Sequence, residues 1–178
     1  MALATKQAWI ERGLQIVAEQ GALALTIEVL CTQLGLTKGS FYHHFKNFQD
    51  YKEALLGYYE EAGTLQIIQL VETVASPQAK IEKLLELTLT GRPSLEVGVR
   101  AWALQDLSVQ VYQERIDKQR LDYLQQLCEA SLDNQVRAKL AARLLYALFV
   151  GSQQLRPPIQ GAELRQLYQE LQQFYHLA

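Results

Sequence analysis

The sequence has few of the residues that hold a chain together through disulfides or metal ions. Its 178 residues include only two cysteines, Cys31 and Cys128, and three histidines. Two separated cysteines make neither a disulfide framework nor a zinc site, and we expect reduced thiols. His43 and His44 are adjacent and cannot point to one metal from a helix, while His176 is remote. We therefore expect no metal site and no other cofactor.

Long hydrophobic runs are also absent. The longest uninterrupted apolar run, Leu144–Val150, is far shorter than the ~18 residues needed to cross a bilayer. The N-terminal stretch Met-Ala-Leu-Ala-Thr-Lys-Gln lacks the basic-then-apolar layout of a secretion signal. The sequence therefore predicts a cytoplasmic protein that has no membrane partner.

Neither sign of charge is in large excess. The chain has 17 Lys and Arg against 19 Asp and Glu, a formal net charge of −2. This balance argues against a protein that coats nucleic acid by bulk positive charge, but it allows a small, local DNA-binding face. Residues 1–52 hold five basic and four acidic side chains, and the remainder holds 12 basic and 15 acidic. A mildly basic N-terminal part thus precedes a mildly acidic body.

Strand signals are nearly absent, whereas helical periodicity runs almost from end to end. We predict an all-α protein of about nine helices. Near the N-terminus, Thr26, Thr37 and Asn47 are placed to cap helices, and Gly21 and Gly35 to end them. Beyond these, we expect a helix from Asn47 to Val71, one begun by Ser76-Pro77, two over 95–108 and 111–131, one from a cap at Asp133 to Leu155, and a last one over 162–176.

The segment Thr26–Tyr51, TIEVLCTQLGLTKGSFYHHFKNFQDY, contains two short helices joined by a tight Leu-Gly-Leu-Thr turn. This pattern predicts a helix-turn-helix, because glycine permits the turn and apolar side chains can lock the two helices together. The second helix would then present cationic and hydroxyl groups that suit a phosphate-lined groove, from Lys38, Ser40, Tyr42, His43 and Lys46. The backbone N–H groups of Thr37, Lys38 and Gly39 would add an anion site at its start.

These residues resemble the DNA-binding region of the tetracycline-repressor (TetR) family of bacterial transcription regulators. The resemblance covers about residues 6–56 and is strongest in the run Lys38-Gly39-Ser40-Phe41-Tyr42-His43-His44-Phe45. It implies a homodimer that binds a palindromic operator in double-stranded DNA and that a small-molecule effector releases. By position, it also implies that Thr26 contacts a phosphate. The candidate DNA-binding residues are then Thr26, Thr37, Lys38, Gly39, Ser40, Tyr42, His43 and Lys46.

One position departs from the family pattern. Family members often have a lysine immediately after the cap of the fourth helix, where it holds a phosphate, and this sequence has Phe48 there. Lys46 or Lys52 could take over that contact. His44 is expected to lie on the Phe41 side of its helix and to serve packing or capping.

Two apolar stripes near the C-terminus form a candidate dimer interface. A helix pair with wide apolar stripes can pack both on its own core and on a twofold partner, although the same stripes could serve the monomer core alone. The helix-turn-helix favours the dimer, because dimeric helix-turn-helix proteins place two recognition helices about 34–36 Å apart on DNA. The interface candidates are Val136, Leu140, Leu144, Leu148, Leu164, Leu167, Leu171 and Phe174.

Aromatic residues with polar tips suggest a ligand pocket in the helices between, although ordinary cores contain the same residue types. The candidates are Tyr58, Tyr59, Trp102, Tyr112, Tyr123 and Tyr146, with Arg100 and Asp106 as groups that could orient a ligand. We predict a helix-turn-helix DNA-binding domain over residues 1–50 and a helical effector-binding and dimerisation domain over 51–178.

The leading interpretation is a dimeric, sequence-specific DNA-binding regulator, and a repressor rather than an enzyme. The sequence has no Gly-rich phosphate loop, nucleophile elbow or His-x-x-x-His pair, so no catalytic residues are assigned. Two alternatives stay open: a helical dimer that acts through protein partners and, ranked below it, a small helical enzyme.

Overall fold

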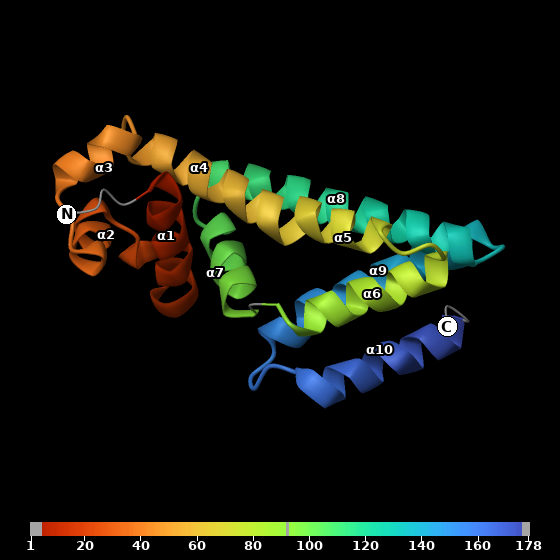
Figure 1. Cartoon of the computed structure of the whole chain (residues 1–178). Coiled ribbons are helices and arrows are strands. Elements are labelled where there is room, and N and C mark those ends of the chain that lie inside the picture. Colours follow the sequence, from red (N-terminus) through yellow and green to blue (C-terminus); the bar gives the residue numbers. More distant parts are fainter. Residues whose placement is uncertain (1–4, 92, 176–178) are drawn as a thin grey trace. The chain divides into compact units, whose positions relative to one another are not determined.

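The computed structural model describes residues 5–91 and 93–175, and every regular element in these ranges is helical (Figure 1). A π-helical turn, Glu61–Leu65, joins α4 to α5 without a break, so the described residues form nine separate α-helical rods. The predicted all-α architecture is confirmed. The helices are α1 (Lys6–Gln20), α2 (Ile27–Leu34), α3 (Lys38–His44), α4 (Phe48–Glu60), α5 (Gln66–Glu72), α6 (Pro77–Leu89), α7 (Pro93–Ala103), α8 (Leu107–Ser131), α9 (Gln135–Gln154) and α10 (Gly161–Tyr175), with a short 3-10 turn over Ala22–Ala24.

Local side-chain caps begin several helices where the sequence predicted them. Thr26, Thr37, Asn47 and Ser76 each accept a hydrogen bond from the backbone N–H three residues further on. Each of these bonds pairs a donor that the first turn of a helix leaves without a partner. The starts of α2, α3, α4 and α6 are therefore fixed by residues next to them in the chain.

Two predicted boundaries are wrong. Asn134, not Asp133, caps α9, because the Asn134 side chain accepts from Arg137 N at 3.0 Å. The predicted helix 95–108 ends at Ala103, and α8 begins at Leu107 because Asp106 Oδ1 accepts from Ser108 N at 2.9 Å. Helix α10 reaches Tyr175, and the predicted end at His176 lies outside the described residues.

The chain packs as two compact units. The first contains residues up to Ala62 together with Ser94–Glu114, and the second contains Gly63–Pro93 together with the residues from Arg115 onward. These units describe packing rather than function, so the functional boundary near residue 50 stays a prediction. Among the described residues, no helix has both the length and the apolar content that crossing a membrane requires.

The first unit is built on large aromatic side chains. Trp9, Phe41, Phe45 and Tyr51 are all fully buried, and α1 packs against α2 and α4 around them. The ring of Phe41 lies 5.5 Å from Trp9, 5.2 Å from Phe45 and 5.4 Å from Tyr51, centroid to centroid. Tyr51 Oη donates to the Trp9 carbonyl at 2.9 Å, and a Cβ at Gly13 would lie only 1.8 Å from that oxygen. Gly13 therefore makes room for the hydroxyl.

The second unit has a core of small and aliphatic side chains. Helix α10 packs along α6 and α9 (Figure 1). Ala138, Ala141 and Ala142 on α9 are completely buried beside Leu145, and Ile81 and Cys128 join the same cluster. Small residues on one helix face allow a close approach of the neighbouring helices, so this core is made by many modest contacts.

Candidate nucleic-acid interface

The predicted helix-turn-helix is formed by α2, α3 and the turn between them. Gly35 ends α2 in the left-handed conformation, at φ 66° and ψ 32°, which costs little for a residue without a Cβ. Leu36 N then donates back to the Cys31 carbonyl at 2.9 Å, and Thr37 caps α3. The direction of α3 relative to α2 is thus set by hydrogen bonds within ten residues of sequence.

Aromatic packing fixes which face of α3 is turned outward. Phe41 and the residue after the helix, Phe45, are buried among Trp9 and Tyr51. Because these anchors lie on one side of a seven-residue helix, the opposite side faces solvent. Cys31 of α2 is buried as well, as its apolar stripe predicted, and its burial raises the pKa of the thiol.

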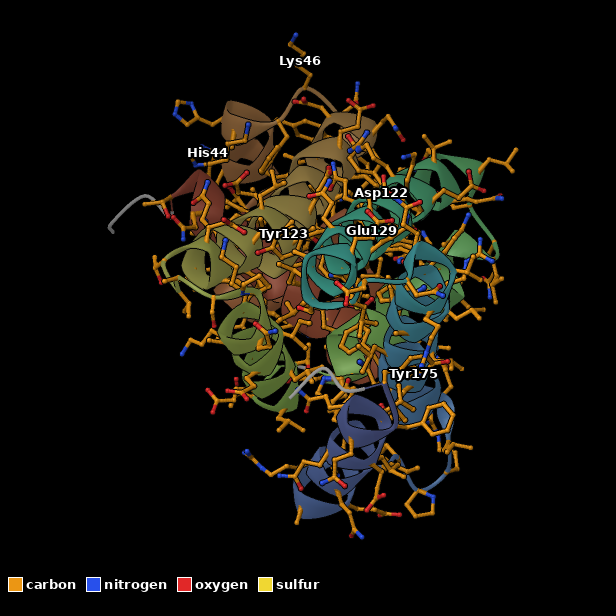
Figure 2. The ribbon with its side chains drawn as sticks, turned by 90° about the vertical axis from the view of Figure 1, so that its right-hand side faces the viewer. His44, Lys46, Asp122, Tyr123, Glu129 and Tyr175 are labelled. Atoms are coloured by element: carbon orange, nitrogen blue, oxygen red, sulfur yellow. The ribbon has the colours of Figure 1, made fainter. Side chains whose placement is uncertain are left out.

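Most candidate DNA-binding residues lie on the outward side. Tyr42 is 54% exposed. The others that are exposed are Thr37, Lys38, Gly39, His43 and Lys46. Lys46 extends from the turn after α3, away from the ribbon (Figure 2). His44 is half-buried, with its ring 6.2 Å from that of Phe45, as expected for a packing residue.

Two of the candidates are less accessible. Ser40 is half-buried, and its Oγ is enclosed with no hydrogen-bond partner among the described residues. Thr26 is half-buried, and its hydroxyl oxygen accepts from Val29 N at 3.2 Å. To contact DNA, the Ser40 side chain would therefore have to rotate. Thr26 would have to donate the hydrogen of its hydroxyl group, because its oxygen already accepts a hydrogen bond.

The structure reveals an ion pair that the sequence analysis missed. Lys38 Nζ, at the start of α3, pairs with Glu28 Oε1 in the first turn of α2, and both side chains are exposed. The hydrogen bond with Lys38 lowers the pKa of Glu28, and the same bond raises the pKa of Lys38. The ten-residue separation crosses the turn, so no helical spacing rule signals the pair.

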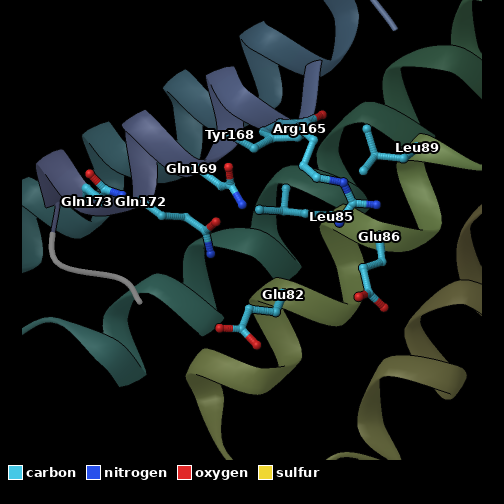
Figure 3. Close-up of a pocket in the computed structure, with 9 residues that line it drawn as sticks. All are labelled: Glu82, Leu85, Glu86, Leu89, Arg165, Tyr168, Gln169, Gln172 and Gln173. Carbon is cyan, nitrogen blue, oxygen red and sulfur yellow. The ribbon is translucent and has the colours of Figure 1, made fainter. Parts of the chain in front are cut away.

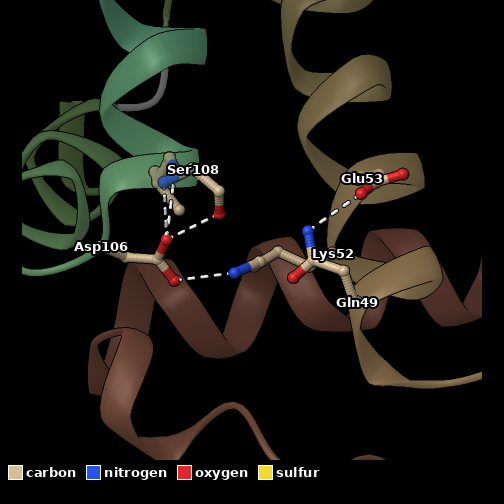
Figure 4. Close-up of polar contacts among 6 residues, drawn as sticks. Gln49, Lys52, Glu53, Asp106 and Ser108 are labelled. Atoms are coloured by element: carbon tan, nitrogen blue, oxygen red, sulfur yellow. Dashed lines mark hydrogen bonds and ion pairs between the residues drawn. The ribbon is translucent and has the colours of Figure 1, made fainter.

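A second ion pair involves Lys52, one of the two lysines that could take over the phosphate contact expected at the position of Phe48. Lys52 is buried, and its Nζ lies 2.7 Å from Asp106 Oδ2 (Figure 4). The hydrogen bond from Lys52, followed by that from Ser108, lowers the pKa of Asp106 to about 2. Lys52 is therefore engaged inside the first unit and does not replace the missing phosphate contact. Lys46 remains, because its side chain is exposed and has no partner among the described residues.

Phe48 itself has a packing role. It is half-buried, and its ring lies 5.9 Å from Tyr51. The position therefore extends the aromatic core of the first unit instead of offering a cation.

The predicted pocket aromatics are divided between the two units. In the first unit, Tyr59 Oη donates to Glu96 Oε2 at 2.6 Å, and Arg100 pairs with the same carboxylate at 3.1 Å. Tyr58, Trp102 and Tyr112 are half-buried in that unit. Arg100 and Asp106, expected to orient a ligand, thus hold Glu96 and Lys52 in this structure.

In the second unit, the two remaining tyrosines also have acidic partners. Tyr123 Oη donates to Glu72 at 2.6 Å, and Tyr146 Oη donates to Asp117 at 2.8 Å. A cavity of about 420 Å³ lies between α6 and α10, and none of the six predicted aromatics is among its lining residues (Figure 3). Its lining is mainly polar and consists of Glu82, Leu85, Glu86, Leu89, Arg165, Tyr168, Gln169, Gln172 and Gln173.

The candidate interface residues fall into three groups. On α9, Val136, Leu140 and Leu144 are 71%, 49% and 45% exposed, and on α10 Phe174 is exposed too. Leu148, Leu167 and Leu171 are half-buried. Leu164 is buried in the core of the second unit. The guanidinium of Arg137 lies 5.7 Å from the ring centroid of Tyr175, which is a cation–π contact.

No group of three or more metal-ligating side chains occurs within the described part of the chain. Among the same residues, the polar groups of the candidate interface are cations, hydroxyls and backbone N–H groups at a helix start. These are groups that bind phosphates and base edges in DNA.

Comparison with known proteins agrees with this geometry. Residues 10–58 match the family model described as bacterial regulatory proteins, tetR family. No curated protein sequence gives a significant match. The match therefore covers α2, α3 and most of α1 and α4.

Solved structures resemble the chain over nearly its whole length. A transcriptional regulator of the TetR/AcrR family is 20% identical, with a TM-score of 0.83 over 96% of this chain and 97% of that one. The reduced form of NemR from E. coli is 18% identical, with a TM-score of 0.79 over 96% and 97% of the two chains. A regulator from Saccharomonospora viridis in complex with choline is 17% identical, with a TM-score of 0.78 over 96% and 95%. The helix-turn-helix region of the chain therefore matches the tetR family model, and the chain as a whole has the fold of solved TetR/AcrR-family regulators.

Proposed function

We propose that the protein is a dimeric repressor that binds a palindromic operator and is released by a small-molecule effector. The observation that carries the proposal is the outward side of α3, where Lys38, Tyr42 and His43 stand exposed on a helix anchored by Phe41 and Phe45. A helix held rigidly from one side can enter a major groove with the other. The proposal assigns DNA binding to residues 1–50 and effector binding and dimerisation to residues 51–178, in the cytoplasm.

The exposed groups suggest a division of roles on DNA. Thr37, Gly39 and Lys46 offer backbone N–H groups or a cation and would position the domain on phosphates. Lys38, Tyr42 and His43 can reach base edges from the exposed side of α3. Thr26 and Ser40 would contribute once DNA reorients their hydroxyls.

Dimerisation is supported by the exposed apolar face of α9. Val136, Leu140 and Leu144 follow one another at intervals of four residues, so they share one side of the helix, and all three are exposed. A stripe of this kind on a soluble chain favours burial against a second copy. Two DNA-binding domains acting together would also compensate for the small positive charge of each domain.

Two observations support a small-molecule effector. The similar regulator from Saccharomonospora viridis is in complex with choline, and the six predicted aromatics provide rings and hydroxyls of the kind that line ligand pockets. Several of these hydroxyls bond to carboxylates within their own unit, so a ligand there would have to exchange with an internal partner.

The deciding experiment is selection of genomic DNA fragments by the purified protein, followed by sequencing. We expect an inverted-repeat consensus and saturable binding that weakens as salt rises. Sedimentation of the free protein should give the mass of two chains. Leu140→Glu should give one chain, and Gln135→Glu, at the start of the same helix, controls for the added charge. Binding without sequence preference would instead favour action through protein partners.

A further inference from the structure

The proposed DNA-binding domain, residues 1–50, and the start of α4 beyond it have few cations, and most of these already contact other side chains. Lys52 pairs with the carboxylate of Asp106, and Lys6 holds its ammonium 5.3 Å from the ring centroid of Phe45. Arg12 donates to the neutral Gln15 amide. Of the lysines and arginines in the described residues 5–52, Lys38 and Lys46 remain near the outward side of α3, so the state of each one matters for DNA binding.

Lys38 is not an isolated positive charge. Its ammonium pairs with Glu28, and both side chains are more than half exposed, so the pair lies at the surface beside the exposed Thr37. Viewed from a phosphate several ångströms away, an ammonium and a carboxylate in contact form a dipole with almost no net charge. The pair therefore removes about one of the few unit charges that this surface could offer to DNA.

We propose that Glu28 is a specificity-determining residue, because it suppresses the contribution of Lys38 to sequence-independent DNA binding while leaving Lys38 able to donate to a base. The inference rests on the proposed function. An ammonium has three N–H donors, so Lys38 can keep its bond to Glu28 and still donate to O6 or N7 of a guanine. A contact with a phosphate, by contrast, gains little from a charge that is already neutralised.

The experiment compares a random-sequence duplex with the operator obtained by fragment selection, using fluorescence anisotropy over a range of salt concentrations. The variants are Glu28→Gln, Lys38→Gln and the double variant. Glu19→Gln is the matched control, because Glu19 is also exposed in the first unit but accepts from the neutral Gln15 amide.

We expect Glu28→Gln to bind random DNA more tightly than the parent. The slope of log affinity against log salt concentration should be steeper by about 0.9 for each DNA-binding domain. For a dimer, whose two domains together make the dependence steeper by about 1.8, the gain over the parent should then be about twelvefold larger at 50 mM than at 200 mM salt. Operator affinity should change less, so the ratio of operator to random binding falls. Lys38→Gln should weaken random binding, because it leaves the Glu28 carboxylate without its cation, and the double variant, which has no charge at either position, should bind random DNA about as the parent does.

Three results would overturn the inference: an unchanged salt dependence in Glu28→Gln, the same gain in Glu19→Gln, or a gain that persists in the double variant. A readout without DNA tests the pair separately, because NMR titration of the Glu28 carboxyl should show its pKa rising in Lys38→Gln. If the parent protein binds no DNA, the proposed function and this inference both fail. If the parent binds its operator and Glu28→Gln gains no more on random DNA than Glu19→Gln does, this inference alone fails.

Discussion

The two packing units differ in the side chains that build their cores. The first unit fixes the seven-residue helix α3 with fully buried rings, chiefly Phe41 and Trp9, whereas the second packs the twenty-residue helix α9 through buried alanines. A short helix has few positions to bury, so each must provide a large area. A long helix can distribute the same stabilisation over many small contacts.

As a consequence, α3 and α9 differ in how sharply their buried residues are separated from their exposed ones. In α3, Phe41 is fully buried and its neighbour Tyr42 is 54% exposed. In α9, the buried Ala141 and Ala142 are flanked by partly exposed leucines, and the apolar character continues around the helix. The first pattern suits a helix that offers polar groups to a ligand, and the second suits a helix that packs on both sides.

The largest expected effect is the loss of a ring from the first core. Phe41→Ala should lower the free energy of unfolding by about 3–5 kcal/mol, because it removes the ring that contacts Trp9, Phe45 and Tyr51. Urea unfolding followed by tryptophan fluorescence measures it. Ala141→Gly in the second unit should cost far less, about 1 kcal/mol, mainly through helix propensity. Equal losses in the two variants would contradict the distinction between the cores.

A tight site in the same core should resist added volume. Gly13→Ala would place a Cβ 1.8 Å from Tyr51 Oη and 2.6 Å from a Leu55 methyl, so we expect a loss of about 1–3 kcal/mol in unfolding free energy. Combining it with Tyr51→Phe should recover part of the loss, since the hydroxyl is the closer obstacle. The double-mutant cycle in urea measures the coupling, and strict additivity would place the strain elsewhere.

The parts of this structure that were predictable from sequence are those determined by neighbouring residues. Thr26, Thr37 and Asn47 cap helices through bonds to N–H groups three residues away, and Gly35 turns the chain at the end of α2. The helix-turn-helix follows from such local signals, and so does the outward direction of Tyr42 once Phe41 is assigned to the core.

The polar partnerships were not predictable, because they join residues brought together only by packing. Lys52 and Asp106 are 54 positions apart, and Lys38 meets Glu28 across a turn. The cap at Asp106 is local, but the apolar pattern before and after it runs on and hides the break between α7 and α8. The aromatic pocket candidates share a residue type rather than a place, since the two units divide them.

After Phe41→Ala and Gly13→Ala, the next largest loss of stability is expected from breaking the Lys52–Asp106 ion pair. The pKa of Asp106 is about 2, below its ordinary value of 3.8, so the pair stabilises the fold above pH 4 and its contribution is lost as the pH falls towards 2. We expect Asp106→Asn to cost about 1–2 kcal/mol at neutral pH and to remove this part of the acid sensitivity. Unfolding measured from pH 7 to pH 2 tests both effects, and parallel pH curves for parent and variant would contradict them.

The smallest expected effect on stability belongs to the outer side of α3. Tyr42→Ala and His43→Ala should change the unfolding free energy by no more than about 0.5 kcal/mol, because both side chains are exposed beside an intact core. The same variants should weaken operator binding by about tenfold or more, since a base contact contributes about 1–3 kcal/mol. Paired unfolding and anisotropy measurements separate the two quantities. Loss of folding in either variant would mean that the residue belongs to the core, and unchanged operator affinity would mean that the reading surface lies on another side of the helix.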